Sequence, residues 1–594
     1  MHKREVPRVS TMRLINTDTL DLEEFYGTEI PIYAILSHTW LRREEVTFQE
    51  WLKRDTDTSV RAKSGYAKIL AACQLARKSS LEWLWVDTNC IDKTSSAELA
   101  EAINSMYEWY ERSAICYAYL SDVSTSPGPE NDLEFNKEFS RSRWWTRGWT
   151  LQELLAPRKV LFFTREWKLI DNRTSLASKI PITRGTLPQR AYASEKMSWL
   201  SKRETTRIED MAYCMLGLFD INMPLLYGEG RKAFLRLQEE IIRVSNDHTI
   251  FCWTWTKTVP RDWVSMLAPW PDTFVNSSGF VAVLTRDNYE SVPTPYSITN
   301  VGLSIKLPAV STMSSWFVFL DVRHRGFARN TRSCIHISRL GESGPLRRFQ
   351  FPRSPIALRR SAAEKKDGSN AIHLHDWIIA SRMPLAHFVD YPNIVPQNYN
   401  ILLFIDKAII NLRTNLDTFS QRLIARAEAS WGTLDLATKI YSLAPVGPNA
   451  FAGLLNLPLR GNDVRLTYLF IAVVDATTTN SSWHCEVALT EDIECLYVPL
   501  PEHERSPGSK MKACRETWFQ QALNRAFQRP GNGSMVSETK DRSLKLGIGG
   551  LVNFEPGFHV RSAYLSSPRR FELPIPVERY VSDAVSMALD SGSY

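Results

Sequence analysis

The sequence predicts an α/β domain over residues 1–165, a helical extension over residues 166–255 and a β-rich region over residues 256–594. In the first part, short apolar runs alternate with segments of helical periodicity, which is typical of βαβ units around a mostly parallel sheet. In the second part, apolar residues recur at helical spacing. In the third part, short apolar runs are separated by turn residues, which favours a sandwich or barrel-like assembly.

Five apolar runs predict the strands of the first domain. They are Met12–Asn16, Ile30–Leu36, Leu81–Val86, Ala114–Leu120 and Lys159–Phe163. Helices are predicted at Tyr66–Lys78 and Ser96–Arg112, the second with a serine N-cap and Glu98 in its first turn. Polar residues that follow parallel strands are expected to converge at the carboxyl edge of the sheet. They are Ser37–Trp40, Asp87–Asp92, Ser121-Asp122 and the loop before Trp144.

The later parts of the chain carry weaker signals. A helix is expected to begin near Thr205, and an amphipathic helix, Arg231–Val244, follows the turn Asn222–Gly230. Exposed loops are expected near residues 354–370 and 501–541, which are rich in charged and turn-forming residues. Strands of the β-rich region are expected at Ile250–Trp255, Gly279–Leu284, Val301–Leu307, Trp316–Val322, Ile401–Ile405, Leu466–Val474 and His484–Ala488.

Composition excludes several classes of protein. The net charge of +7 is small beside 72 basic and 65 acidic side chains, so the chain shows no clear nucleic-acid-binding signature. The nine cysteines are scattered and form no Cys-x-x-Cys pair, which favours reduced thiols over a disulfide framework or a zinc site. The first residues resemble no signal peptide, and no apolar run could span a bilayer. A cytoplasmic protein is therefore expected.

The most unusual stretch is Ser142–Leu155, in which three tryptophans and two arginines precede a short apolar helix with one carboxylate, Glu153. Trp149 and Glu153 are four residues apart and share a helix face. Two explanations fit this pattern. Glu153 belongs to a binding or catalytic site, or it forms a buried ion pair with Arg143 or Arg147 inside a tryptophan-rich core.

Several stretches, in unchanged order, resemble the heterokaryon-incompatibility (HET) domain of filamentous ascomycetes. They are Met12–Thr17, Ala34–Trp40, Trp85–Lys93, Glu101–Met106, the tryptophan stretch up to Glu153, Thr205–Tyr213 and Pro224–Gly230. The resemblance covers residues 12–255 and fades beyond them. Two positions depart from the family pattern: Leu41 stands where the family often has glycine, and Asn89 where a cysteine or small residue is common.

The resemblance implies a HET domain over residues 1–165, with a TIR-like or flavodoxin-like sheet. It implies a role in non-self recognition, or vegetative incompatibility, in which programmed cell death follows fusion of unlike hyphae. HET domains are distantly similar to TIR domains, many of which cleave NAD⁺ with a glutamate in a Trp-x-x-x-Glu-Leu helix. Trp149–Leu154 fits that pattern. The chain has no Gly-x-x-x-x-Gly-Lys-Ser/Thr motif and no WD-type repeat.

On this interpretation Glu153 is the catalytic residue of an NAD⁺ nucleosidase. Its carboxylate would stabilise the oxocarbenium-like ribose that forms as nicotinamide leaves. NAD⁺ would be the substrate, and no cofactor or metal is required. Trp144 or Trp149 would stack on the ligand, and Arg143 or Arg147 would bind the pyrophosphate. The ligand-binding candidates are Ser37, His38, Trp40, Asp87, Cys90, Asp92, Trp144, Arg147 and Trp149.

Other interpretations stay open. Cys90 and His38 could form a thiol dyad, or Asp87, Asp92 and Glu153 could gather a Mg²⁺ ion. Ser37 and His38 are adjacent on a strand and point to opposite faces, which disfavours a serine–histidine pair. The competing class is a non-enzymatic module that signals by self-association, with the β-rich half as the partner-binding region. Further along, Arg207, Glu209 and Asp210 are expected to form an internal ion-pair network.

Overall fold

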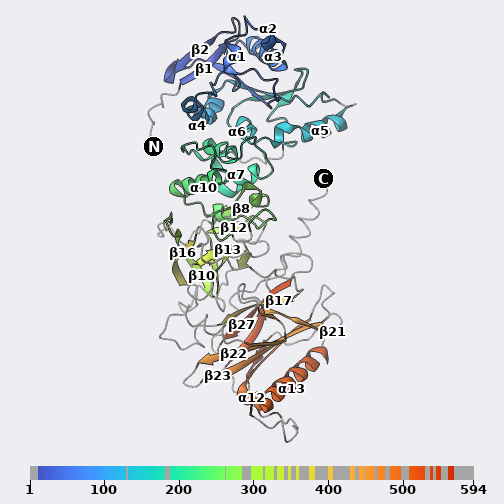
Figure 1. The fold of residues 1–594 in the computed structure, drawn as a ribbon. Coiled ribbons are helices and arrows are strands. Elements are labelled where there is room, and N and C mark those ends of the chain that lie inside the picture. Colours follow the sequence, from blue (N-terminus) through green and yellow to red (C-terminus); the bar gives the residue numbers. More distant parts are fainter. Residues whose placement is uncertain are drawn as a thin grey trace. The chain divides into compact units, whose positions relative to one another are not determined.

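The computed structural model describes residues 11–128, 131–180, 188–260, 263–283 and 296–311, and shorter segments between residues 315 and 566. Contacts divide the chain into two compact units (Figure 1). Unit 1 contains Met1–Ile250 and Ala268–Ser278, and unit 2 contains Phe251–Leu267 and Gly279–Tyr594. Among the described residues, no helix is both long and apolar enough to cross a membrane.

Unit 1 is built on one seven-stranded sheet with the order β2-β1-β4-β3-β5-β6-β7. The four central strands β4, β3, β5 and β6 are parallel, whereas β1, β2 and β7 run antiparallel to their neighbours. This confirms the expected mostly parallel sheet, and β2 and β7 are additions to the five predicted strands. The strands are β1 (Thr11–Asn16), β2 (Leu22–Tyr26), β3 (Tyr33–His38), β4 (Trp83–Trp85), β5 (Ile115–Tyr119), β6 (Val160–Phe163) and β7 (Leu169–Asn172).

The central strand β3 is buried along its whole length. The two predicted helices are present as α3 (Ser64–Lys78) and α4 (Ser96–Arg112), and the Ser95 hydroxyl caps α4 by accepting from the backbone N–H of Glu98. The polar segment before α3 contains two short helices that periodicity did not indicate, α1 (Phe48–Trp51) and α2 (Thr58–Ala62). Thr47 and Asp57 cap them with side-chain oxygens.

The tryptophan stretch follows a further helix, α5 (Asp132–Arg141). It forms a 3₁₀ turn, η2 (Arg143–Thr146), and then the short helix α6 (Thr150–Leu155), all six residues of which are buried. The extension after β7 contains α7 (Ala193–Leu200), α8 (Asp210–Tyr213), α9 (Leu216–Phe219) and α10 (Lys232–Val244). The amphipathic helix α10 is thus confirmed. The helix expected from Thr205 is broken into α8 and α9, and Asp220 ends α9 in a left-handed conformation.

The expected ion-pair network of Arg207, Glu209 and Asp210 is replaced by contacts with the turn after α9. The Glu209 carboxylate accepts from the N–H groups of Gly228 and Gly230 at 2.8 and 2.9 Å. Asp210 accepts from the Tyr227 hydroxyl, whose ring lies 4.3 Å from the Arg207 guanidinium. These side chains therefore fix a turn, because backbone N–H groups and a phenol are closer partners for them than opposite charges.

Unit 2 contains several small, mostly antiparallel sheets. The described segments form several separate small sheets and not one closed barrel, so a single barrel for this half of the chain is wrong. The predicted strand Ile250–Trp255 is also wrong, since η4 (His248–Phe251) occupies its start and no strand follows. Other predicted strands correspond to β8 (Phe280–Ala282), β10 (Gly302–Ser311), β11 (Ser315–Phe319), β12 (Val322–His324), β17 (Tyr399–Ile405), β23 (Val464–Val474) and β24 (Ser482–Leu489).

Further strands of unit 2 were not predicted from periodicity. They are β9 (Ser297–Ile298), β13 (Thr331–Arg339), β14 (Leu346–Arg348), β15 (Ile356–Arg359), β16 (His373–Ala380), β18 (Glu428–Trp431), β19 (Thr433–Leu434), β20 (Tyr441–Ser442), β21 (Ala444–Gly447), β22 (Ala450–Arg460), β25 (Val536–Glu538), β26 (Lys545–Gly549) and β27 (His559–Ser566). The loop expected near 354–370 overlaps β15, and residues 360–370 lie outside the described residues.

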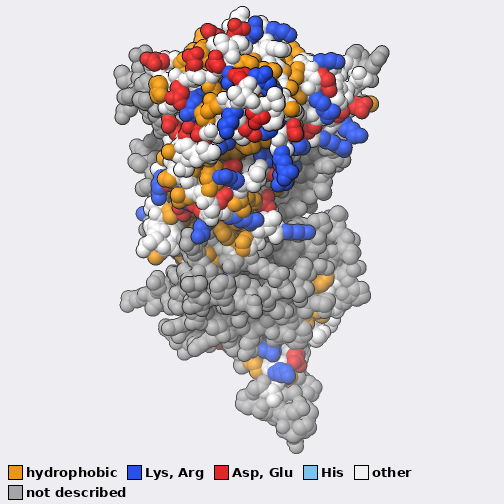
Figure 2. All heavy atoms as spheres, turned by 45° about the horizontal axis from the view of Figure 1, so that its top comes forward, with side chains coloured by type: hydrophobic (Ala, Val, Ile, Leu, Met, Phe, Trp, Pro, Cys, Tyr) orange, Lys and Arg blue, Asp and Glu red, His pale blue; other side chains and the backbone are white. Residues whose placement is uncertain are grey.

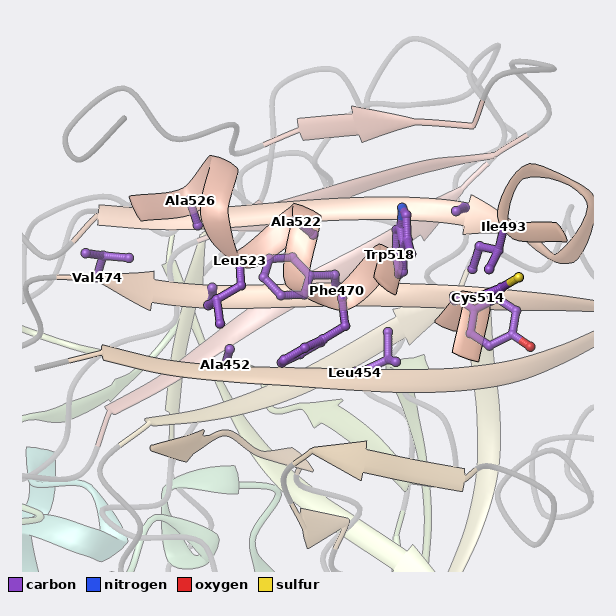
Figure 3. Packing of buried hydrophobic residues seen from close by; sticks show 14 residues of the cluster. Ala452, Leu454, Phe470, Val474, Ile493, Cys514, Trp518, Ala522, Leu523 and Ala526 are labelled. Carbon is purple, nitrogen blue, oxygen red and sulfur yellow. The ribbon is translucent and has the colours of Figure 1, made fainter. Parts of the chain in front are cut away.

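The loop expected near residues 501–541 is replaced by a 22-residue helix, α13 (Pro507–Gln528), with β25 after it. A short helix, α12 (Thr490–Glu494), precedes it. One face of α13 packs on β22 and β23 (Figure 3), with Trp518, Phe519 and Ala522 against Phe470. The helix forms because these apolar residues recur every three or four positions and find a sheet to cover.

Candidate acidic site at the edge of the sheet

Glu153 on α6 is hydrogen-bonded to the end of the central strand β3. The Ser37 hydroxyl donates to Glu153 Oε2 at 2.5 Å and accepts from Trp144 Nε1 at 2.8 Å. Trp144 is fully buried and packs edge-on against Trp145 and Phe162. The ring of Trp144 thus packs in the core, while its indole N–H donates to Ser37, whose hydroxyl in turn donates to Glu153.

The Glu153 carboxyl group lies in a nearly solvent-free environment, and the residue is only 7% exposed. Burial raises the pKa of Glu153 to about 8, and the charge of Asp87 acts in the same direction. The Ser37 hydrogen bond and the charges of Arg203 and Arg147 oppose this increase. Neither Arg143 nor Arg147 lies within ion-pair distance of Glu153 in the described part of the chain. The buried ion pair considered for this residue is therefore absent there.

A second cluster of charged side chains lies on the other face of β3. His38 is 6% exposed, and its Nε2 lies 3.6 Å from Glu45 Oε2 and 3.8 Å from Asp87 Oδ1. Lys68 Nζ contacts both oxygens of Glu45 at 2.7 Å. Burial alone would raise the pKa of Glu45, but the His38 imidazole and the Lys68 ammonium lower it to about 2. Ser37 and His38 thus point to opposite faces, as expected for neighbours on a strand.

Trp40 follows β3 and remains 45% exposed, yet its ring is held in place. Its Nε1 donates to Asp87 Oδ2 at 3.0 Å, and Lys93 Nζ lies 3.6 Å from the ring centroid. An Arg143 nitrogen lies 3.5 Å from the Trp40 carbonyl oxygen. An exposed aromatic ring with a fixed orientation and neighbouring cations is suited to stacking on a ligand.

Three other candidates have structural partners. The Cys90 sulfur accepts from the Val86 N–H at 3.4 Å, and burial raises the pKa of its thiol to about 12, so a reactive thiolate is disfavoured. Asp92 accepts from the N–H and hydroxyl of Thr94 at 2.9 and 2.6 Å and thereby stabilises the turn before α4. Trp149 is half-buried, and its hydrogen bond to Asp210 is one of the contacts that limit the increase in that residue's pKa.

Arg147 points toward the helical extension, where it donates to the Thr206 hydroxyl at 3.0 Å.

The Mg²⁺ alternative finds no support, since no cluster of His, Cys, Asp and Glu in the described residues could hold a metal ion. The eight cysteines that lie in the described segments are all buried, and none of them forms a disulfide bond.

Sequence reasoning missed Glu45, Lys68, Lys93, Thr150 and Arg203. Lys68 carried a signal, because it lies on the buried face of α3 beside Ile69 and Ala72, where a lysine requires a carboxylate partner. Arg203 follows α7 in a polar stretch and gave no such signal. Its position beside α6 depends on the tertiary fold.

Several buried polar atoms at this edge have no hydrogen-bond partner among the described residues. They are Nδ1 and Nε2 of His38, Oγ1 of Thr88, both amide atoms of Asn89 and Nε2 of Gln152. Because unpartnered buried polar atoms are costly, such groups concentrate where water or a ligand supplies the missing hydrogen bonds.

On the face of unit 1 that Figure 2 shows, acidic and basic side chains are intermixed with hydrophobic ones, so this face presents no single-sign charge patch.

Fold and site together define an α/β domain with a buried carboxyl group at the carboxyl edge of its parallel strands. Residues 33–136 match the sequence model of the family described as heterokaryon incompatibility protein (HET). The matched range contains Ser37, His38 and Asp87 and ends before Glu153.

The amino-terminal region is also similar to a known protein, the vegetative incompatibility protein HET-E-1 of Podospora anserina. The two chains are 44% identical over 246 residues, which is 39% of this chain and 18% of that protein. The chain thus spans less than a fifth of the length of this relative. No solved structure matches the chain.

Proposed function

We propose that the chain acts in fungal vegetative incompatibility, as an effector that triggers programmed cell death through its HET domain. We further propose that it acts in the cytoplasm, through protein partners or self-association. The similarity to a vegetative incompatibility protein supports the biological role. The observation that favours an enzymatic effector is Glu153, a buried carboxyl group with a raised pKa, held by a serine hydroxyl at the edge where α/β sheets bind ligands.

The proposed reaction is TIR-like cleavage of NAD⁺ to nicotinamide and ADP-ribose. The bond between the ribose C1′ and the nicotinamide nitrogen breaks, and its electron pair leaves with neutral nicotinamide. Water then adds to C1′ and releases a proton. A carboxylate beside the ribose would stabilise the positive charge that develops there. Trp40 offers a stacking surface, while Lys93 and Arg143 are nearby cations for the pyrophosphate.

The raised pKa of Glu153 suits this substrate. A carboxyl group with a pKa of about 8 is mostly protonated at neutral pH in the empty protein. A cationic nicotinamide ring beside it would favour the ionised form, because opposite charges lower a carboxyl pKa. The active form of the site would thus be produced by the substrate's own charge, and kcat/KM, which reflects the ionisation of the empty protein, should increase as pH rises toward 8.

The test is nicotinamide release from NAD⁺ by the purified full-length chain, dilute and concentrated. Glu153→Gln retains size and a hydrogen-bonding group, and it should lose at least about 100-fold in rate. Glu134→Gln, at an exposed position on α5, is the matched control and should keep full activity. Wild-type protein that releases no nicotinamide at any concentration would exclude the enzymatic proposal.

The alternative is a non-enzymatic module that signals by self-association. The exposed apolar side chains of Ile32 (73%) and Leu133 (91%) in unit 1 are the observation that favours it. Expression in a fungal host separates the two. Growth arrest that Glu153→Gln abolishes supports catalysis, whereas growth arrest that persists in Glu153→Gln and disappears in Leu133→Glu supports self-association.

A further inference from the structure

The helical extension supplies a strand-like segment that lies against the residues preceding α6. The Glu204 N–H donates to the Thr146 carbonyl at 2.6 Å, and the Gly148 N–H donates to the Glu204 carbonyl at 2.9 Å. Arg147 and Glu204 form an isolated parallel bridge. The helix that carries Glu153 is thus fixed by β3 on one side and by residues 203–206 on the other.

Arg203 inserts its guanidinium into this junction. The residue is 6% exposed, and its donors reach the Trp199 carbonyl at 3.2 Å, the Arg147 carbonyl at 2.5 Å and Thr150 Oγ1 at 2.8 Å. The Thr150 hydroxyl in turn lies 2.6 Å from the carbonyl of Trp144, the residue whose indole donates to Ser37. Contacts therefore run from Arg203 through Thr150 and Trp144 to the hydroxyl that holds Glu153.

No carboxylate forms an ion pair with Arg203 in the described part of the chain, which is unusual for a buried guanidinium. Burial lowers the pKa of Arg203 to about 10, so it remains charged at neutral pH. Glu153 lies one helical turn beyond Thr150, and each of the two charges acts on the pKa of the other. When Glu153 is ionised, its carboxylate is thus a counter-charge for Arg203 at a distance.

We propose that Arg203 is the positioning residue of the acidic site. It holds the first turn of α6 and, through its charge, keeps Glu153 able to ionise near neutral pH. This inference rests on the proposed role of Glu153. It also implies that the site is incomplete without the helical extension, because Arg203 belongs to that extension. Arg203 lies well beyond the range matched to the family, residues 33–136.

The experiment measures the ionisation of Glu153 in the full-length chain by infrared difference spectroscopy, with Glu153→Gln as the subtracted reference. Arg203→Gln removes the charge and retains a donor, and the titration midpoint should rise by about one pH unit. Arg203→Lys retains the charge and should keep the midpoint within about half a unit. Arg77→Met, at the end of α3 that leads into β4, removes an exposed arginine as the matched control and should leave the midpoint unchanged.

The same variants are assayed for the pH dependence of nicotinamide release. With the midpoint one unit higher, the kcat/KM of Arg203→Gln should be about fivefold below that of wild type at pH 8 and should approach it at higher pH. A midpoint in Arg203→Gln equal to that of wild type would overturn the inference. Absence of nicotinamide release in all variants would instead overturn the proposed function, while the spectroscopic midpoints still decide the role of Arg203.

If Arg203→Gln does not fold, Thr150→Val provides the decisive variant. It removes the hydroxyl that accepts from the guanidinium and leaves the charge in the chain. Because Arg203 then has one hydrogen bond fewer to fix its position, the titration midpoint of Glu153 should rise. The increase should be smaller than the increase in Arg203→Gln, which lacks the charge. An unchanged midpoint in folded Thr150→Val would contradict the inference.

Discussion

Glu153 combines a hydrogen bond from one serine with an environment almost free of water. Desolvation disfavours the charged carboxylate more strongly than the Ser37 hydroxyl and two distant arginines favour it, and the pKa consequently rises to about 8. Glu45, on the other face of the same strand, shows the opposite outcome. It is also poorly exposed, but the His38 imidazole lies beside it and Lys68 contacts both of its oxygens, and its pKa falls to about 2. At the residue scale, a cation in direct contact with the carboxylate decides whether the pKa of a poorly exposed glutamate falls or rises.

The raised pKa of Glu153 predicts a specific pH dependence of stability. Between the ordinary value of 4.5 and about 8, the folded protein holds a proton that the unfolded chain has lost. Stability therefore decreases with rising pH across this window, by up to about 1.4 kcal/mol per pH unit, and levels off above it. Glu153→Gln has no titratable group at this position, so its free energy of unfolding should increase relative to that of wild type as pH rises from 5 to 8. Thermal unfolding at each pH measures the difference, and a constant difference would refute the prediction.

At the scale of elements, α6 is too short to be stable by itself and depends on its neighbours. β3 contacts α6 through the hydrogen bond between Ser37 and Glu153, and residues 203–206 bind the segment that precedes α6. This second contact requires a glycine. A Cβ at Gly148 would lie 2.5 Å from Thr205 Cγ2 and 3.2 Å from Cys214 Sγ. Thr205 cannot easily rotate away, because its hydroxyl bonds to the Arg207 carbonyl at 2.5 Å.

Gly148→Ala should therefore destabilise unit 1 by about 1–3 kcal/mol, because it forces this junction apart. Chemical denaturation of the full-length chain measures the loss. Gly128→Ala is the control, since a Cβ there meets nothing within 4 Å. Adding Thr205→Ser removes the clashing methyl group and retains the hydroxyl, and it should restore most of the stability. A double variant as unstable as Gly148→Ala would show that the clash lies elsewhere.

At the scale of the whole molecule, the two units have separate cores. That of unit 1 lies around the parallel sheet, and a major core of unit 2 lies between α13 and the strands β22–β24. Phe470 and Trp518 both lie in this second core (Figure 3). The Phe470 ring contacts the rings of Trp518 and Phe519. This core and the residues around Glu153 belong to different units.

Phe470→Ala should cost about 3–5 kcal/mol through the cavity that it leaves. In calorimetry of the full-length chain, we expect the unfolding transition of unit 2 to move to lower temperature while that of unit 1 stays in place. Phe527→Ala is the control, because this residue of α13 is 41% exposed and should change the unfolding temperature little. Equal shifts of both transitions would contradict independent cores.

Much of unit 1 could be predicted because its signals are local. The apolar runs ending at Ser37 and Val86 and the capped helix after Ser95 each depend on a few neighbouring residues. The prediction failed where local signals conflicted. The helix α13 was assigned to a loop on the basis of its flanking Pro, Gly and charged residues, although Cys514, Trp518 and Ala522 recur at helical spacing.

The sequence alone indicated the parallel sheet, its polar carboxyl edge and Glu153 as the carboxylate to test, because periodicity and strand ends are properties of short segments. Only the folded chain decided what surrounds that carboxylate. The Ser37 hydroxyl comes from 116 residues away, and Arg203 comes from a separate helical segment. Contacts over such separations depend on how the elements pack, and packing also sets the burial that raises the pKa of Glu153.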